Sequence, residues 1–252
     1  MSVKQKRPNT IERIERLKAK AAGDADVFLR ALTVAARDPS PNVRSFVMSE
    51  LEKAELHAGL SLAEAGLKDK SLRVRGEAAV CVGTLLGQTG VLHPGLRLLL
   101  EDPYWVIRDD AQESLGWIGD RGALPQIARL LEDDEPVVRS HCATVLADLG
   151  GKTYKKLLKA RLIVETAEHP QAGLLTALIN LGERALLPRL LGYLKSGEYL
   201  VRCATANYLE HIDLTASEKL LAMRALRRAA REPITRADQS SAQCVLQSLK
   251  QN

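Results

Sequence analysis

The segment Asp133-Asp-Glu-Pro-Val-Val-Arg-Ser-His-Cys-Ala-Thr-Val-Leu-Ala-Asp-Leu-Gly150 decides the fold. It opens with an acidic turn and passes through Arg139 into a run of small and apolar residues. Cys142, Leu146 and Leu149 follow Arg139 at the spacing of one face of an α-helix. Gly150 stands where a left-handed residue commonly ends a helix. The segment therefore predicts an acidic turn followed by a helix that packs on one side.

The same pattern returns along the whole chain. Its anchors are Arg44, Arg75, Arg108, Arg139, Gln171, Arg202 and Gln239, at intervals of 31, 33, 31, 32, 31 and 37 residues. Such regular intervals indicate an internal repeat. A first helix precedes each anchor turn, often with proline near its start, and no alternating β-branched stretch predicts a strand. We expect an all-α fold, an α-solenoid of about seven helix pairs that wind as a right-handed superhelix.

These units resemble the HEAT repeat, in the short form named after phycobilisome lyases. The resemblance rests on the acidic turn with Val-Arg and on the small-residue second helix that closes on Leu-Gly, and it covers residues 24–250. The fifth and seventh repeats lack the anchoring arginine. The resemblance implies that the anchors form a structural ladder from repeat to repeat, made by Asp38, Arg44, Asp69, Arg75, Asp102, Arg108, Asp133, Arg139 and Arg202.

The excess positive charge lies at the start of the chain. The net charge is +5, and residues 1–20 already carry it, which leaves the remaining residues neutral. We expect a disordered basic N-terminus over residues 1–9 and a single HEAT-like domain over residues 10–252. Its first helix is predicted to cap the repeats, with Thr10 as N-cap, Ile11, Ile14 and Leu17 toward the first repeat, and Arg13 and Lys18 toward solvent.

Composition points to a cytoplasmic protein. No apolar run approaches the length of a membrane span, and the start of the chain lacks the apolar stretch of a secretory signal. Cys81, Cys142, Cys203 and Cys244 lie far apart, which predicts free, largely buried thiols and no zinc site. We expect no cofactor and no metal.

An acidic track is predicted on the inner face of the second helices, at positions two, five and nine after each anchor. Its members, with the neighbouring residue at the same edge, are Glu77, Asp109, Asp110, Glu113, Trp117, His141 and Asp148. Carboxylates do not neutralise phosphates, so a basic segment of another protein suits this track better than a nucleic acid. The alternative is a solvated inner face on which Trp117 fills a gap between helices.

Two basic stripes are predicted on first helices. Their principal residues are Lys155, Lys156 and Lys159 in one and Arg224, Arg227, Arg228 and Arg231 in the other. They are either solvated faces or contacts for a phosphate or an anionic membrane.

No motif for catalysis stands out: there is no phosphate loop, nucleophile elbow or His-Glu-x-x-His. The His-Glu pairs through which HEAT-like deoxyhypusine hydroxylases bind iron are also absent. We favour a non-enzymatic protein-binding scaffold, with an immunity or inhibitory partner as one concrete form. The alternatives are a bilin-lyase-like protein that acts on a chromoprotein and, third, a DNA-binding or alkylpurine-glycosylase-like protein, for which Trp117 with Asp110, Glu113 or Asp148 would be the candidates.

Overall fold

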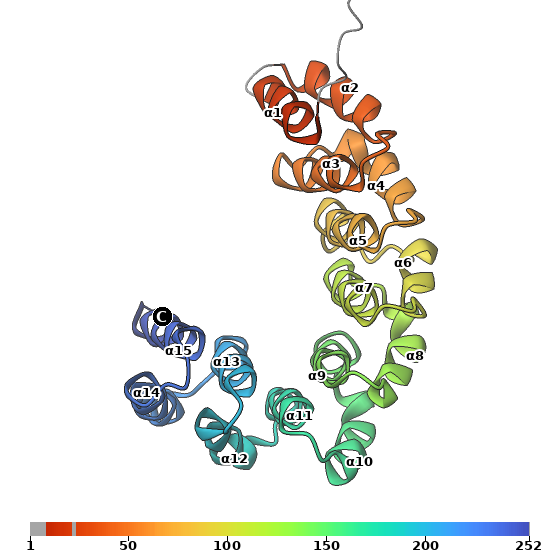
Figure 1. The fold of residues 1–252 in the computed structure, drawn as a ribbon. Coiled ribbons are helices and arrows are strands. Elements are labelled where there is room, and N and C mark those ends of the chain that lie inside the picture. Colours follow the sequence, from red (N-terminus) through yellow and green to blue (C-terminus); the bar gives the residue numbers. More distant parts are fainter. Residues whose placement is uncertain (1–8, 22–23, 252) are drawn as a thin grey trace, which may run out of the picture. The chain divides into compact units, whose positions relative to one another are not determined.

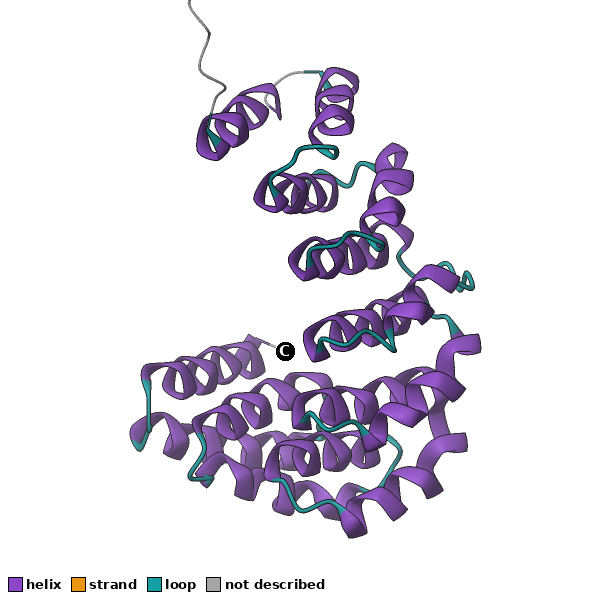
Figure 2. Cartoon of the chain, turned by 45° about the vertical axis from the view of Figure 1, so that its right-hand side comes forward, coloured by secondary structure: helices purple, strands orange, loops and turns teal. Residues whose placement is uncertain are grey.

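The computed structural model describes residues 9–21 and 24–251, and within these ranges every regular element is a helix (Figure 2). The predicted all-α repeat fold is confirmed. The handedness of the superhelix stays a prediction. The described residues form two compact units, one that ends at Asp120 and one that begins at Arg121. We call them unit 1 and unit 2.

Unit 1 is a stack of helix pairs in two rows (Figure 1). The second helices of the pairs pack side by side in the order α3, α5, α7, and α1 packs against α3. Of the first helices, α4 packs against α5 and α6 packs against α7. The bounds are α1 Thr10–Ala21, α2 Ala25–Ala35, α3 Pro41–Lys53, η1 His57–Gly59, α4 Leu60–Gly66, α5 Leu72–Leu86, α6 Pro94–Leu99 and α7 Trp105–Ile118.

Unit 2 repeats this arrangement, with α9, α11, α13 and α15 as the packed second helices. Among its first helices, α8 and α12 are short and are flanked by 3-10 turns, and a π-helical turn, η4, ends α9. The bounds are η2 Arg121–Ala123, α8 Leu124–Ile127, η3 Ala128–Glu132, α9 Pro136–Val145, η4 Leu146–Gly150, η5 Gly151–Tyr154, α10 Lys155–Val164, α11 Glu168–Asn180, η6 Arg184–Leu186, α12 Leu187–Gly192, η7 Tyr193–Lys195, α13 Tyr199–Tyr208, η8 Leu209–His211, α14 Ala216–Arg231 and α15 Arg236–Gln251.

Anchor arginines link the repeats of unit 1. Arg44 donates from Nε and Nη2 to the two carboxylate oxygens of Asp69, at 2.6 and 2.8 Å. Arg75 donates in the same way to Asp102, at 2.8 and 3.1 Å. Each of these arginines also donates to the carbonyl oxygen six residues earlier, at 2.7 Å from Asp38 and 2.9 Å from Asp69. One side chain thus closes its own turn and holds the next one, which sets the register of the stack.

The same contacts continue in unit 2 with changed residue types. Arg139 donates to both carboxylate oxygens of Glu165, at 2.9 and 3.1 Å, and to the carbonyl oxygen of Asp133 at 2.6 Å. Gln171, at the anchor without an arginine, donates from Nε2 to the carbonyl oxygen of Glu165, again six residues earlier. An amide therefore closes the turn of the fifth repeat, while Glu165 serves as its acidic residue.

The last repeat is linked through different partners. Arg202 donates to the carbonyl oxygen of Ser196 at 2.6 Å and lies 3.5 Å from the carboxylate of Asp238. Gln239, the degenerate seventh anchor, donates to the carbonyl oxygen of Ala230 at 3.2 Å. The bidentate pattern of the earlier anchors thus gives way to a hydrogen bond from Nη1 of Arg202 to the carbonyl oxygen of Glu232, at 2.7 Å, beside one long ion pair.

The acidic turn residues also order their own turns. In each case the carboxylate accepts a hydrogen bond from the backbone N–H two residues later, at 2.8 to 2.9 Å in three turns and 3.0 Å in the fourth. The turns begin at Asp38, Asp69, Asp102 and Asp133. This local bond explains why a short acidic residue begins these turns.

The predicted N-terminal helix is present, but it begins one residue earlier and is capped by a different residue. The N–H of Glu12 donates to Oδ1 of Asn9 at 2.9 Å, so Asn9 is the N-cap and Thr10 is the first helical residue. Asn9 is therefore ordered into the cap, and the rest of the predicted disordered segment, residues 1–8, lies outside the described residues.

The face that α1 presents to the first repeat also differs from the prediction. Leu17 is buried and Ile14 half-buried, but Ile11 is 71% exposed. Arg13, expected to face solvent, pairs with Asp38 at 3.1 Å. Arg13 thus contacts the first acidic turn as Arg44 contacts the second. The spacing in sequence is the same in both pairs, because Arg13 precedes Asp38 by as many residues as Arg44 precedes Asp69.

Three details of the repeats differ from the sequence-based expectations. The left-handed residue after α9 is Gly151, with a φ of 61°, because the π-helical turn carries Gly150 into helical backbone. Gly173 and Thr176, two and five residues after the anchor Gln171, are buried and do not line the inner face. At Gly173 the neighbouring helix is so close that a Cβ would lie 2.5 Å from the backbone oxygen of Ser140. All four thiols are free, but Cys244 is exposed.

Candidate functional site

A surface groove lies between α5 and α7 in unit 1. We call it the acidic groove. Glu77 of α5 and Asp110 of α7 supply its carboxylates. The other lining residues are mostly apolar or lack a side chain: Leu72, Arg73, Gly76, Val80, Val106 and Ile107. Glu77 and Asp110 stand two residues after successive anchors, which is why the packed second helices bring them together.

Asp110 is the most perturbed carboxylate of the groove. Burial, together with the negative charges of Asp109, Glu113 and Glu77, raises the pKa of Asp110 to about 6. A carboxylate in such surroundings is stabilised by an incoming cation, because the cation offsets both the burial and the repulsion.

Gly76 makes room for this carboxylate against α5. A Cβ at position 76 would lie 2.6 Å from Oδ2 of Asp110 and 3.2 Å from Cδ1 of Ile107. The position one after the anchor is occupied by larger residues in the neighbouring repeats, such as Ser45 and Asp109. The missing side chain therefore lets the carboxylate of Asp110 lie directly on the backbone of α5.

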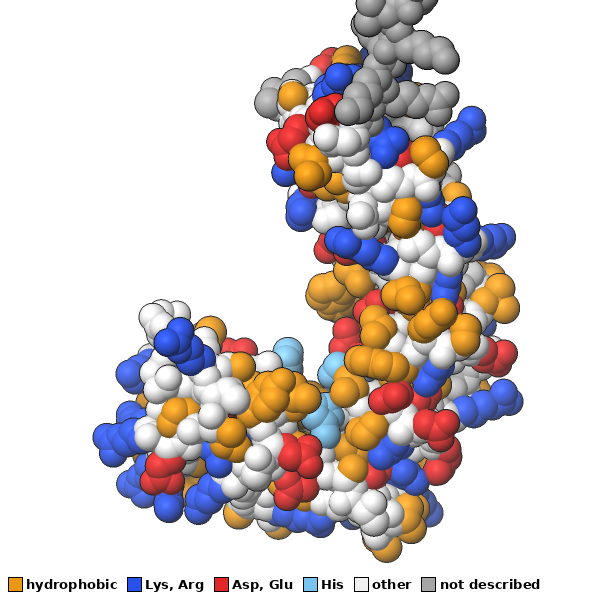
Figure 3. Space-filling view, in the orientation of Figure 1, with side chains coloured by type: hydrophobic (Ala, Val, Ile, Leu, Met, Phe, Trp, Pro, Cys, Tyr) orange, Lys and Arg blue, Asp and Glu red, His pale blue; other side chains and the backbone are white. Residues whose placement is uncertain are grey.

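Further acidic and apolar side chains lie along α7 beside and beyond Asp110. Glu113 is exposed one turn beyond Asp110, and Asp109 accepts a hydrogen bond from Nε2 of Gln112 at 2.8 Å. Trp117, at the C-terminal end of α7, is 61% exposed. Over α5 and α7 apolar and acidic side chains lie next to one another at the surface (Figure 3). The groove thus offers negative charge beside apolar area.

The apolar rim was not anticipated from the sequence. Leu72, Trp105 and Val106 are 41%, 38% and 39% exposed. They stand two and three residues before the anchors Arg75 and Arg108, at the first turn of each helix. The sequence could have indicated this rim through its large apolar residues directly after a polar turn. Such residues lie in the first turn of a packed helix, which neighbouring helices cover only in part.

His141 and Asp148, the other predicted members of the track, belong to unit 2. The ring of His141 packs edge-on against Tyr208, with centroids 6.5 Å apart, and the hydroxyl of Tyr208 lies 2.6 Å from Oγ of Ser140. Desolvation raises the pKa of Asp148, and the nearby His211 opposes the shift. Within unit 2 these two residues belong to α9 and to the π-helical turn that follows it.

The two basic stripes are held differently. Lys155 and Lys159 of α10 pair with the same carboxylate, Glu183, at 2.6 and 2.9 Å, and these contacts lower the pKa of Glu183 to about 2. Lys156 is exposed between them. The first stripe is therefore partly neutralised from within the fold, by one carboxylate that two lysines share.

The arginines of the second stripe are exposed along α14, and Arg228 lies 3.4 Å from the carboxylate of Glu232. Lys and Arg side chains gather over the end of unit 2 that α14 and α15 form (Figure 3). This stripe keeps most of its charge for solvent or for a ligand.

Comparison with known proteins agrees with the repeat pattern. Residues 93–178 match the family model of HEAT repeats. No curated protein sequence matches the chain. None of the helices in the described ranges is both long and apolar enough to cross a membrane.

Solved structures are similar to this chain at low sequence identity, among them the following two. One belongs to the complex of CpcE and CpcF of phycocyanin lyase from Nostoc sp. PCC7120, with a TM-score of 0.65, 17% identity, and coverage of 99% of this chain and 100% of that one. The other is human deoxyhypusine hydroxylase in complex with glycerol, with a TM-score of 0.40, 17% identity, and coverage of 96% and 99%. The first likeness confirms the predicted resemblance to HEAT-like repeats of the phycobilisome-lyase type at the level of the fold.

Proposed function

We propose that this chain, a HEAT-like repeat scaffold, binds a protein partner through the acidic groove, and that the partner inserts a basic segment with apolar side chains. The observation that carries the proposal is the meeting of Asp110 and Glu77 with the exposed apolar rim in one groove. Electrostatic complementarity selects the partner, and the rim supplies apolar contact.

The carboxylates of the groove are suited to a lysine or arginine. The pKa of Asp110 is raised by burial and by three neighbouring acids, and a bound cation would reverse both effects. At pH 7 Asp110 is ionised and ready to pair. Partner affinity should fall as the pH drops from 7 to 5, because protonation removes the charge that the cation recognises.

The same charges disfavour nucleic acid on this face. A phosphate backbone needs lysine and arginine to replace its counterions. Arg73 is the basic residue among those that line the groove, and its guanidinium donates to the side chains of Ser45 and Asn42 of α3. A partner with a basic surface, such as the target of an immunity or inhibitory protein, carries the positive charge that the carboxylates of the groove can pair with.

The experiment is capture of partners from native lysate by wild type and by Asp110→Lys/Glu113→Lys, with quantitative mass spectrometry. A protein enriched by wild type and lost by the double variant supports the proposal. The matched control is Glu55→Lys/Glu101→Lys, which makes the same change in charge at two exposed positions of unit 1 outside the groove. Equal capture by all three proteins would refute the acidic groove as the binding surface.

A second candidate is a bilin-lyase-like role on a chromoprotein. It is supported by the fold shared with the phycocyanin lyase chain over nearly the full length of both. Co-expression with a phycobiliprotein subunit and its bilin tests this candidate by visible absorbance of the purified subunit. Covalent pigment that depends on this chain supports the lyase-like role, and pigment attachment at the same level without the chain refutes it.

A further inference from the structure

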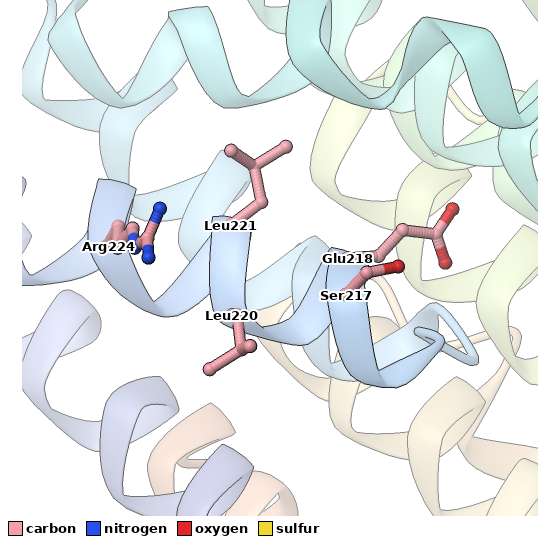
Figure 4. Close-up of a pocket in the computed structure, with 5 residues that line it drawn as sticks. All are labelled: Ser217, Glu218, Leu220, Leu221 and Arg224. Atoms are coloured by element: carbon pink, nitrogen blue, oxygen red, sulfur yellow. The ribbon is translucent and has the colours of Figure 1, made fainter.

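The outward side of α14 combines arginines with exposed leucines. We call this side the α14 face. At the 100° turn per residue of an α-helix its members fall within an arc of about 120°: Ser217, Leu220, Leu221, Arg224, Arg227, Arg228 and Arg231. Leu220 is 59% and Leu221 42% exposed, and they leave the helix on different sides (Figure 4).

The opposite side of α14 fixes the helix in unit 2. Ala222, Met223, Leu226 and Ala229 are buried in a core that includes residues of α11, α12, α13 and α15. A capping box holds the start of the helix: Thr215 accepts from the N–H of Glu218, and the carboxylate of Glu218 accepts from the N–H of Thr215. The α14 face is therefore presented by a rigid, folded element, with no ordering of the backbone required when it binds.

Among the described residues, most of the positive charge of the α14 face is unpaired, although Arg228 contacts the carboxylate of Glu232 at 3.4 Å. In the described part of the chain no carboxylate lies within ion-pair distance of Arg224, Arg227 or Arg231. The nearest acid of the same helix, Glu218, is engaged by Arg184. On α10, by contrast, Lys155 and Lys159 share the carboxylate of Glu183.

The α14 face also lacks the walls of a peptide groove. Its shallow depression is lined by Ser217, Glu218, Leu220, Leu221 and Arg224, all from α14 itself (Figure 4). A bound peptide helix is normally held between two elements, and a nucleic acid would match the arginines but leave both leucines without a partner. A fluid bilayer needs no wall: it takes leucines into the acyl boundary and arginines among anionic headgroups.

We propose that the α14 face docks unit 2 on an anionic lipid bilayer, with Leu220 and Leu221 inserted and Arg224, Arg227, Arg228 and Arg231 at the headgroups. The contact is peripheral, independent of the acidic groove, and weakened by salt, because the headgroup attraction is screened. Each arginine near such a surface contributes about a fivefold gain in partition coefficient.

The test is sedimentation of the full chain with vesicles of about three parts phosphatidylcholine to one part phosphatidylserine. Wild type is expected to bind these vesicles at low salt and not vesicles of phosphatidylcholine alone. Arg224→Glu/Arg227→Glu should lower the partition coefficient at least about 25-fold. The matched control Lys152→Glu/Lys156→Glu, an equal change in charge on exposed residues of η5 and α10, should retain most of the binding.

A leucine variant separates insertion from charge alone. Leu220→Ser/Leu221→Ser leaves the net charge unchanged and should lower binding several-fold, while circular dichroism reports an intact fold. The proposal is overturned if wild type does not sediment with the anionic vesicles, or if the leucine variant binds as well as wild type. Binding to a short DNA duplex that exceeds binding to the vesicles would also overturn it, in favour of a nucleic acid.

Discussion

Replacement of Arg75 by alanine should break the link between two repeats of unit 1. The side chain makes three strong contacts: two hydrogen bonds to the carboxylate of Asp102, at 2.8 and 3.1 Å, and one to the carbonyl oxygen of Asp69 at 2.9 Å. The side chains of Arg75 and Asp102 are only 12% and 6% exposed. In Arg75→Ala the carboxylate of Asp102 stays buried and keeps the N–H of Tyr104, at 3.0 Å, as a donor.

The expected cost follows from this geometry. Removal of one partner from a buried ion pair costs about 3 to 5 kcal/mol, and the remaining backbone donor places this case at the low end, ~3 kcal/mol. The control is Arg73→Ala in the same helix. Arg73 is exposed and donates to the side chains of Ser45 and Asn42, at 3.1 and 3.4 Å. Its loss should cost under about 1 kcal/mol.

Urea unfolding measures both variants. Trp105 and Trp117, the two tryptophans of the chain, both lie in α7, so their fluorescence reports on unit 1, while circular dichroism reports on all helices. Arg75→Ala should shift the fluorescence transition to lower urea, ahead of most of the helical signal. A loss of stability within about 1 kcal/mol of the Arg73→Ala value would refute the argument that the buried pair sets the register.

Three further changes have expected outcomes. Because the pKa of Asp110 is raised to about 6, its ionised form costs stability at pH 7, and Asp110→Asn should be more stable than wild type there by about 1 kcal/mol. In urea unfolding this difference between the two proteins should shrink as the pH falls from 7 toward 4, because protonation of Asp110 in wild type removes the cost. The hydrogen bond from Arg44 lowers the pKa of Asp69, so this pair contributes its stability above the usual carboxyl pKa of about 4 and loses it in more acidic solution. Asp69→Asn should therefore cost about 2 kcal/mol of stability at pH 7 and flatten the acid limb when the stability is measured against pH. Arg13→Ala removes the ion pair to Asp38 and should speed amide exchange in α1 and α2 while exchange in α7 stays unchanged.

The repeat architecture was readable from the sequence because its defining contacts are local. The acidic turn residue bonds two residues ahead, and the anchor bonds six residues back, so both ends of each contact recur in the same short motif. Substitutions at the anchor that preserve the bond six residues back were harder to recognise. Gln171 keeps the contact to the carbonyl of Glu165 without the charge of an arginine.

The capping helix shows what a periodic pattern leaves out. The apolar spacing of α1 indicated a helix but placed Ile11 toward the first repeat and Arg13 toward solvent. In the structure Arg13 reaches Asp38, and the exposed side carries Ile11. The pairing depends on how α1 packs against α3, which the pattern of one helix does not specify.

The candidate site was predicted in part. The spacing from the anchors placed Glu77 and Asp110 on packed second helices, and the structure brings both to the acidic groove. The sequence did not indicate the role of Gly76, because the space that its missing side chain leaves is filled by Asp110, 34 residues later in the chain. Nor did it indicate the exposed rim at Leu72 and Val106, since exposure depends on the neighbouring repeat.

The most direct test of the central proposal is hydrogen–deuterium exchange of the chain alone and with the partner that wild type captures and Asp110→Lys/Glu113→Lys does not. The account predicts slower exchange on binding in peptides that cover α5, Leu72–Leu86, and α7, Trp105–Ile118. Protection confined to other helices, with α5 and α7 unchanged, would contradict the acidic groove as the binding surface.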